Sequence, residues 1–186
     1  MKGILIVFAV LMFSALLFAN PVWDTPINIR KTHSIDLSES YATAADGSTI
    51  YVWSDVSSGS RDIYAQRIDH LGNKIWQEPL ALTSSAGSQD YPVIKAYNTN
   101  EFVIAYYDYH ENSEGNIRVI KINLAGTQLW QEGGVIASSS TGSKKEMKLL
   151  VVNQDLYLVW SERMSGDKKL HGQRLNSLGN RQWGQL

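Results

Sequence analysis

The feature that most constrains this chain is a segment that occurs three times at an almost constant spacing. Residues 62–76, DIYAQRIDHLGNKIW, return in altered form as residues 116–130 and again as residues 169–183. Each copy contains a strand-like run, a glycine, and a second run that ends on tryptophan. The glycines are 54 and 53 residues apart: Gly72, Gly126 and Gly179. A fixed period of this length predicts a repeat architecture.

Aromatic residues follow the same spacing. The repeated segments end on Trp76, Trp130 and Trp183, and further upstream the spacing aligns Trp53, Tyr107 and Trp160. We expect the tryptophans to pack between repeats rather than to form a platform for sugars, because they recur at structural positions. We expect the three glycines to occupy turns at positive φ.

Each unit of about 53 residues contains four strand-like runs. The second run is strongly apolar in every unit, at residues 50–53, 102–107 and 156–160. Such a short, continuous apolar run predicts a strand that is covered on both faces. The sequence therefore predicts an all-β fold of three four-stranded antiparallel meanders, which stack as β-propeller-type blades. The alternative, a β-sandwich of unrelated strands, requires no sequence period.

The two ends of the chain match each other in phase. Residues 23–29, WDTPINI, resemble residues 76–82, WQEPLAL, which contain the fourth run of the first unit. The units are predicted at about 30–82, 83–137 and 138–186, and the last of them stops where its fourth run begins. We therefore expect the strand at 23–29 to complete the last blade, which would leave no exposed sheet edge.

Three units are fewer than the four to eight blades of a typical propeller. Three interpretations remain open. Two chains join into a homodimer with a six-bladed ring, the chain is a piece of a longer repeat protein, or three blades stack in an open or unusually tight arrangement.

The first 19 residues have the pattern of a secretory signal peptide. Lys2 precedes an apolar run at residues 4–18, and Ala19 is small enough to precede the cleavage point. The alternative is an uncleaved anchor, but the apolar run is shorter than the roughly 20 residues that span a bilayer. The sequence has no cysteine, so the exported domain, residues 20–186, would fold without disulfides. We predict a bacterial protein that is secreted, displayed at the cell surface or periplasmic.

The charge balance argues against polyanionic partners. Without residues 1–19 the chain has 16 Lys and Arg against 18 Asp and Glu, a net charge of −2. A near-neutral, mixed surface predicts no nucleic-acid partner, and no membrane association beyond the signal peptide.

The first unit resembles the repeats of large exported bacterial surface proteins. The resemblance rests on VWSD at residues 52–55, DIYAQRID at 62–69 and LGNKIW at 71–76. It implies propeller-like blades and an exported, non-enzymatic scaffold, and it supplies no catalytic or binding residues. The second unit departs from the pattern, since Val119, Ile120 and Lys121 replace the AQR of the first.

The sequence contains none of the common catalytic motifs. It has no glycine-rich phosphate loop, no HExxH and no GxSxG. Its four histidines are not at metal-ligand spacing from one another: His33, His70, His110 and His171. We therefore predict no enzymatic activity, no metal site and no cofactor. Ca²⁺ is the one ion that acidic loops suggest, although the spacing of a calcium-binding loop is missing.

Acidic residues recur directly after the second run of each unit, as Asp55, Asp108 and Glu162. They begin the longest loops and would line one rim of the blades, where they would bind sugar hydroxyls or Ca²⁺. The alternative is an ion pair within each blade, such as Asp55 with Arg61, because repeats reuse scaffold interactions. The second loop is the most distinctive, and we predict a ligand site there at Asp108, Tyr109, His110 and Glu111.

The leading functional prediction is an exported, non-catalytic binding or scaffold module whose ligand is a glycan or a surface protein. One alternative is a glycoside hydrolase on a propeller, which needs two carboxylates about 5–9.5 Å apart. Rim carboxylates that are each paired with a cation of their own blade would count against it. The other alternative is a fragment of a longer repeat protein without a function of its own.

Overall fold

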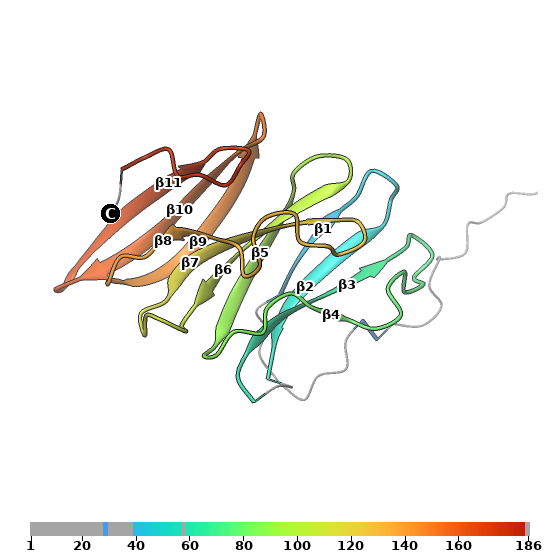
Figure 1. The fold of residues 1–186 in the computed structure, drawn as a ribbon, viewed down its shortest axis with the longest axis horizontal. Coiled ribbons are helices and arrows are strands. Elements are labelled where there is room, and N and C mark those ends of the chain that lie inside the picture. Colours follow the sequence, from blue (N-terminus) through green and yellow to red (C-terminus); the bar gives the residue numbers. More distant parts are fainter. Residues whose placement is uncertain (1–27, 30–38, 57–58, 185–186) are drawn as a thin grey trace, which may run out of the picture.

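The computed structural model describes residues 28–29, 39–56 and 59–184 (Figure 1). In these residues every regular element is a β-strand and every pairing is antiparallel, which confirms the all-β prediction. The described part contains no helix that is long and apolar enough to cross a membrane. The predicted signal peptide, and the predicted strand at 23–29 apart from its last two residues, lie outside the described residues.

The strands form three meanders whose order in space is their order in the chain. The first sheet contains β1 (Glu39–Thr43), β2 (Thr49–Asp55), β3 (Asp62–Ile68) and β4 (Leu80–Ala81). The second contains β5 (Gln89–Ala96), β6 (Glu101–Asp108), β7 (Asn116–Asn123) and β8 (Val135–Ser138). The third contains β9 (Ser143–Val152), β10 (Asp155–Met164) and β11 (Asp167–Leu175).

Among the residues that the structure describes, the predicted four strands per sheet occur in the first two sheets. In the third sheet, the described residues after β11 add a single bridge, Leu175 with Arg181. The bridge is repeated in the other sheets as Ile68 with Lys74 and Ile122 with Gln128, so the glycine turn has the same form in all three.

The strand registers correct one alignment of the sequence analysis. The residue opposite the bridge position is Thr49 in β2, Phe102 in β6 and Leu156 in β10. Counting from there, the residue equivalent to Trp53 and Trp160 is Tyr106, not Tyr107. The spacing was misleading because seven residues lie between the paired positions Asp108 and Asn116 of the second sheet, whereas six lie between Asp55 and Asp62 and between Glu162 and Lys169.

Adjacent sheets pack face to face, and we call the face toward the following sheet the forward face and the opposite one the backward face. The first core lies between the forward face of the first sheet and the backward face of the second (Figure 1). Its fully buried side chains include Ile50, Val52 and Ile63 from the first sheet, and Ile94, Phe102 and Ile104 from the second.

A second core joins the forward face of the second sheet to the backward face of the third. Its side chains include Val103, Ala105 and Ile117 from the second sheet, and Leu149, Leu158 and Trp160 from the third. Both junctions therefore place a forward face on a backward face. Burial on both faces explains why the second strands read as continuous apolar runs.

The three turn glycines all have positive φ, at 90° for Gly72, 84° for Gly126 and 82° for Gly179. This is the backbone conformation that glycine adopts without strain. Each turn is held by an acidic or amide side chain that accepts backbone N–H groups, as Asp69 Oδ1 does from Leu71 and Asn73.

The repeat tryptophans divide into three groups. Trp53 and Trp160 are buried at the backward faces of their sheets. Trp76 and Trp130 lie against the glycine turn of the following unit, since a Cβ built on Gly126 or Gly179 would be 3.4 Å from an indole carbon. Trp183 differs, because it is 48% exposed and contacts Tyr157 of its own sheet.

Candidate functional site

Buried carboxylates gather at one edge of all three sheets, which we call the acidic edge. In a meander, the end of the second strand and the starts of the first and third meet at one edge. The carboxylates are at most 4% exposed and lie at these positions: Asp55, Asp62, Asp90, Asp108 and Glu162. The register makes Asp55, Asp108 and Glu162 equivalent, so the structure places the three predicted rim residues at the same position of each sheet.

Asp55 and Asp62 face each other across the β2–β3 hairpin. Directly opposite residues of an antiparallel pair lie on the same face with their Cβ atoms about 5 Å apart. Thr83 lies beside them, with its hydroxyl 3.4 Å from Asp62 Oδ1, and it accepts a hydrogen bond from the Ile63 N–H at 2.8 Å. This is a close pair of buried carboxylates on one face of a hairpin.

Asp90 connects the first two sheets. Its Oδ1 accepts a hydrogen bond of 2.6 Å from the Ser54 hydroxyl, and its Oδ2 lies 3.5 Å from a guanidinium nitrogen of Arg61. The residue after it, Tyr91, has φ of 54° at a bulge in β5. The same bulge occurs in β9 at Glu146, with φ of 58°, so it is a feature of the repeat.

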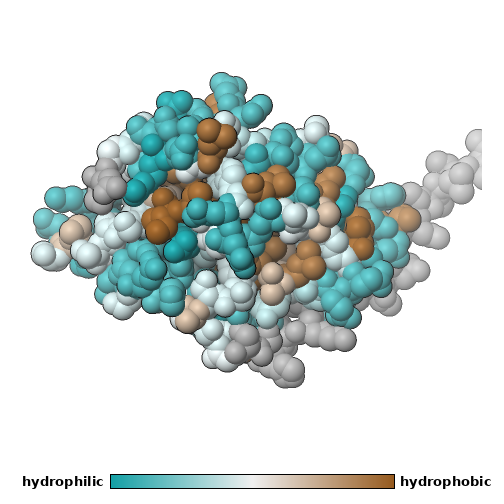
Figure 2. Space-filling view, in the orientation of Figure 1, coloured by the Kyte–Doolittle hydropathy of each residue, from teal (hydrophilic) through white to brown (hydrophobic). Residues whose placement is uncertain are grey.

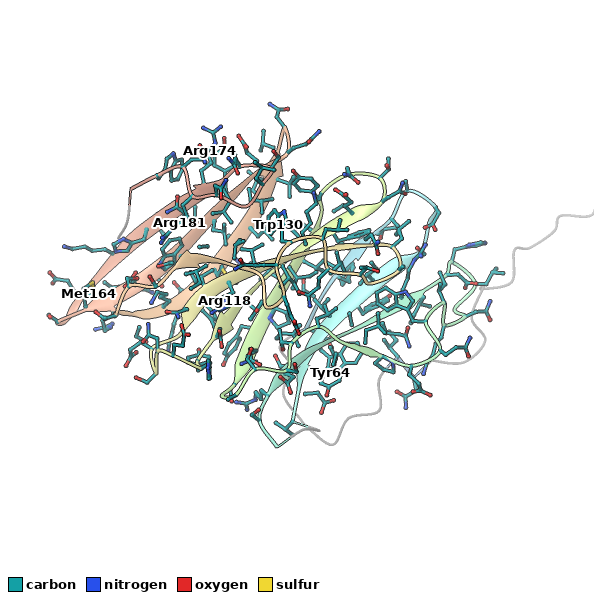
Figure 3. The ribbon with its side chains drawn as sticks, viewed as in Figure 1. Tyr64, Arg118, Trp130, Met164, Arg174 and Arg181 are labelled. Carbon is teal, nitrogen blue, oxygen red and sulfur yellow. The ribbon has the colours of Figure 1, made fainter. Side chains whose placement is uncertain are left out.

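Asp108 is fixed within its own sheet. Arg118, which extends from β7 (Figure 3), places its Nε 2.6 Å from Asp108 Oδ2. Gln89 Nε2 and the His110 N–H both donate to Oδ1 at 3.1 Å. With a cation and two donors, this carboxylate anchors the edge.

Glu162 is held in a similar way by neutral donors and a lysine. Its Oε1 accepts from the Gly142 N–H, and its Oε2 accepts from Trp160 Nε1, both at 3.1 Å. Burial alone would raise the pKa of this carboxyl. Hydrogen bonds from Ser140 and Trp160 and the charge of Lys144 outweigh the burial, so the pKa is lowered. Burial lowers the pKa of Lys144.

We expect Glu162 to make folding stability depend on pH. Its pKa is lower in the folded than in the unfolded chain, so its contribution is present above the ordinary value of 4.5 and is lost as the pH falls through the folded pKa. Urea unfolding of Glu162→Gln should show a deficit relative to wild type at pH 7 that shrinks by pH 3. Glu78→Gln, at an exposed glutamate, is the matched control. A deficit that is the same at both pH values would contradict this role.

The loop predicted to bind a ligand is packed onto the neighbouring segment. Tyr109 donates its N–H to Ser88 O at 2.9 Å, and a Cβ on Gly115 would be 2.9 Å from its ring. Burial raises the pKa of Tyr109. His110 and Glu111 are exposed, and Glu111 lies 3.9 Å from Arg118. Asp108 lies at the acidic edge, and the ligand site at these four residues stays a prediction.

A pocket that the sequence analysis did not predict is lined in part by Thr83, the residue that approaches Asp62. It has a volume of about 340 Å³ and lies where the segment after β4 meets the end of the second sheet's turn. The run of three hydroxyl residues after β4 is the signal that would have found it. The polar groups come from Thr83, Ser84, Ser85, Gln128 and Glu132.

Among the residues that the structure describes, no group of three or more His, Asp and Glu side chains is arranged to hold a metal ion. The carboxylates at this edge are spread over three sheets, and Asp90 and Asp108 are each within 4 Å of an arginine.

The fold resembles that of two solved enzymes. No protein-family model and no curated protein matches the chain. An endo-arabinase from Bacteroides thetaiotaomicron is similar with a TM-score of 0.50 and 13% identity, over 77% of this chain and 58% of the enzyme. An α-L-arabinofuranosidase from Lactobacillus brevis is similar with a TM-score of 0.51 and 12% identity, over 78% and 51%. The chain spans little more than half the length of these proteins.

These neighbours correct the functional prediction. Both are glycoside hydrolases, which contradicts the expected non-catalytic binding or scaffold module and the expected absence of enzymatic activity. The finding favours the alternative, a glycoside-hydrolase-type propeller. At sequence identities of 12–13%, the similarity to these enzymes is a similarity of fold alone.

Proposed function

We propose that the chain forms a propeller-type part of a glycoside hydrolase that acts on arabinose-containing glycans. Two features support the propeller. The three meander sheets stack forward face on backward face, and the fold is similar to that of an endo-arabinase and of an α-L-arabinofuranosidase. The observation that carries the catalytic proposal is the facing pair Asp55 and Asp62, which Thr83 connects to a hydroxyl-lined pocket. The predicted export would bring such an enzyme into contact with polymeric glycans.

The spacing of the pair suits one class of glycosidic cleavage. Carboxyl groups about 5–5.5 Å apart are typical of retaining glycosidases. Opposed residues of a hairpin have Cβ atoms about 5 Å apart, which allows their carboxyl groups to reach this separation. One carboxylate attacks the anomeric carbon while the other, as the acid, protonates the leaving oxygen. Water then attacks the anomeric carbon, the first carboxylate leaves, and the second residue takes the water proton as the base. Ser84, Ser85 and Gln128 would bind sugar hydroxyls in the pocket.

The other rim carboxylates have a different role in this proposal. Asp108 forms an ion pair with Arg118. Glu162 accepts hydrogen bonds from Trp160 and the Gly142 N–H, with Lys144 nearby. We propose that they fix the edge on which the pair stands, as equivalent carboxylates in a repeat protein often do.

Removal of either carboxylate of the pair should abolish most of the activity. We expect Asp55→Asn and Asp62→Asn each to lower kcat at least about 100-fold, because each removes a nucleophile or an acid–base group. The measurement is hydrolysis of arabinan and of an aryl α-L-arabinofuranoside by the purified chain. Proton NMR of the first product should show that the anomeric configuration is retained.

The matched control is Asp155→Asn, which removes a carboxylate paired with Arg174 at the opposite end of the third sheet. It should leave kcat within about twofold of wild type, and circular dichroism should show the same strand content for all variants. A folded wild-type chain that hydrolyses neither substrate would overturn the proposal. Asn variants that are as active as Asp155→Asn would overturn the assignment of the pair.

A further inference from the structure

The forward face of the third sheet is an open surface in the described part of the chain. Ile63 and Ile117 of the first two sheets are completely buried, because the following sheet covers them. Leu170, which the register places at the same position of the third sheet, is 76% exposed. In Figure 2 the surface around the third sheet, at the left, is mainly hydrophilic with small apolar patches. This face is therefore accessible to a ligand.

Trp183, the tryptophan of the third repeat, lies on this face. A Cβ built on Gly172 would be 3.3 Å from Trp183 Cζ3, so the indole lies where a side chain of residue 172 would extend. The equivalent residues are Ala65 in the first sheet and Val119 in the second, and both are completely buried. The Trp183 ring is 5.9 Å from that of Tyr157. We call these two rings the aromatic platform.

A buried amide fixes the backbone of Trp183. The Trp183 N–H donates to Gln173 Oε1 at 3.0 Å, and Gln173 Nε2 donates to Trp183 O at 3.3 Å. Gln173 is 2% exposed, whereas Trp183 is 48% exposed. The backbone that carries the indole is therefore fixed before a ligand arrives, which lowers the entropy cost of binding. An exposed indole offers an apolar ring face, and the C–H face of a sugar ring packs on such a surface.

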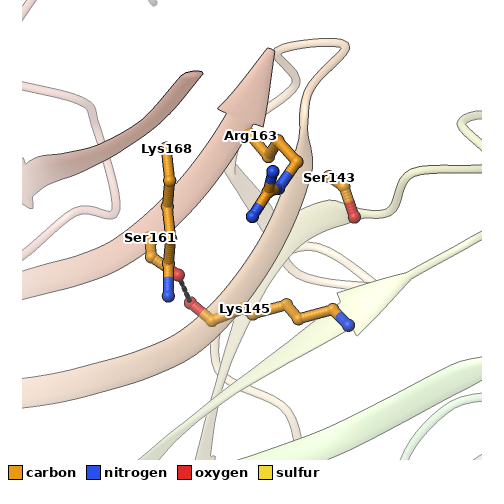
Figure 4. A pocket seen from close by; sticks show the side chains of 5 residues that line it. All are labelled: Ser143, Lys145, Ser161, Arg163 and Lys168. Atoms are coloured by element: carbon orange, nitrogen blue, oxygen red, sulfur yellow. Dashed lines mark hydrogen bonds between the residues drawn. The ribbon is translucent and has the colours of Figure 1, made fainter. Parts of the chain in front are cut away.

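A basic pocket of about 260 Å³ lies on the same face of the sheet (Figure 4). Lys168 forms an ion pair of 3.0 Å with Glu146, but both side chains are exposed, and such pairs contribute little. Within the described residues, Lys145 and Arg163 form no ion pair with a carboxylate. The Ser161 hydroxyl donates to Lys145 O at 3.2 Å. The pocket therefore has positive charge available for an anion, and it is lined by Ser143, Lys145, Ser161, Arg163 and Lys168.

The junction between the first two sheets indicates which anion suits this pocket. There, the Ser54 hydroxyl donates to Asp90 Oδ1 at 2.6 Å, and a guanidinium nitrogen of Arg61 lies 3.5 Å from Asp90 Oδ2. The register makes Ser161 equivalent to Ser54, and Lys168 equivalent to Arg61. The same positions of the first sheet thus bind a carboxylate with a hydroxyl and a cation. A carboxylate is therefore the anion that fits the pocket.

The pocket and the aromatic platform are aligned along β11. Lys168 and Gly172 are four residues apart on one face of the strand, about 14 Å at the usual rise per residue. The exposed Leu170 lies between them. We propose that this face binds an acidic oligosaccharide, with the carboxylate of a uronic acid in the basic pocket and another sugar ring of the same chain against Trp183.

The charge distribution favours a short acidic glycan over a long polyanion such as a nucleic acid. Residues 138–186 contain eight Lys and Arg against four Asp and Glu, a net charge of +4. Residues 30–137 contain eight against thirteen, a net charge of −5. A short ligand with one carboxylate on a sugar ring contacts only the positive unit, whereas a long polyanion would also meet the negative one.

The residues of this face also differ from those that accept a further sheet of protein. Ile50 and Val103 are completely buried in the two cores, and the equivalent residue of the third sheet is Tyr157. An aromatic ring with a hydroxyl suits a sugar, which has both apolar and polar surfaces. The site is separate from the Asp55–Asp62 pair, and binding there does not require hydrolysis.

The test is calorimetric titration of the purified chain with trigalacturonic acid and with its methyl ester, which has the same three rings but no charge. Wild type should bind the acid at least about tenfold more tightly than the ester, because only the acid forms charge-assisted hydrogen bonds in the pocket. Added NaCl should weaken the binding of the acid and leave that of the ester nearly unchanged.

Two variants separate the pocket from the platform. Arg163→Met should lower the affinity for the acid about tenfold and hardly change that for the ester. Trp183→Ala should lower both affinities by the same factor, because the stacked ring is present in both ligands. The matched controls are Lys74→Met, at an exposed cation in the first glycine turn, and Tyr41→Ala, at a ring that is 69% exposed in the first sheet. Both controls should bind as wild type does, and circular dichroism should show an unchanged fold for all four variants.

Three results would overturn the proposal: a folded wild-type chain that binds neither ligand, equal affinity for the acid and the ester, or displacement of the acid by oligothymidylate at the same concentration. The last result would mean that the face binds nucleic acid. Control variants that lose as much affinity as Arg163→Met and Trp183→Ala would overturn the placement of the ligand. Hydrolysis of arabinan is measured separately, so a failure of either proposal leaves the other in place.

Discussion

Replacement of Gly134 by alanine should lower the free energy of unfolding by about 4 kcal/mol, which combines strain at positive φ with forced overpacking. Gly134 has φ of 73° and immediately precedes β8. A Cβ there would be 2.3 Å from Val119 O and 2.7 Å from Ile120 Cγ2. The first of these atoms belongs to the backbone of β7, with which β8 pairs, so the clash can be relieved only by displacing a strand.

The neighbouring glycine supplies the control. Gly133 has the same φ of 73°, but a Cβ there would have no atom within 4 Å. Gly133→Ala should therefore show only the conformational penalty, about 1 kcal/mol. Urea unfolding at fixed protein concentration measures both variants. Equal losses at the two positions would mean that backbone conformation alone, and not the contact with β7, determines the cost.

The repeat period predicts much of this fold because the residues that recur at this period specify local structure, namely turns and buried strands. The turn glycines and the apolar second strands depend on a few neighbouring residues, and they lie where the period puts them. Period counting fails at Tyr106 and Tyr107, where one extra loop residue shifts the alignment. A shift of one residue in a strand moves a side chain to the other face of the sheet. The misalignment therefore assigns the aromatic side chain to the wrong neighbouring sheet.

The candidate site was less predictable because its contacts are made between segments far apart in sequence. The recurrence of Asp55, Asp108 and Glu162 correctly marks equivalent positions, but the sequence does not indicate that Arg118 fixes one of them and Trp160 another. Thr83 reaches Asp62 from a segment 21 residues away. The aromatic and acidic composition of residues 108–115 predicts a ligand site, but it does not indicate that Tyr109 contacts both Ser88 and Gly115.

Trp160→Ala should lower the free energy of unfolding by about 3–5 kcal/mol, the usual range for truncation of a buried tryptophan. Trp160 is completely buried in the core between the second and third sheets, and its ring stacks on His171 at 6.2 Å. Its Nε1 donates to Glu162 Oε2 at 3.1 Å, so the variant leaves both a cavity and a buried carboxylate with one donor fewer.

Trp160→Phe, which keeps most of the apolar volume but not the donor, should lose about 1–2 kcal/mol. Urea unfolding of both variants separates the two contributions. Equal losses would mean that the hydrogen bond to Glu162 carries the whole effect, and an alanine variant within 1 kcal/mol of wild type would mean that this core does not hold the third sheet to the second.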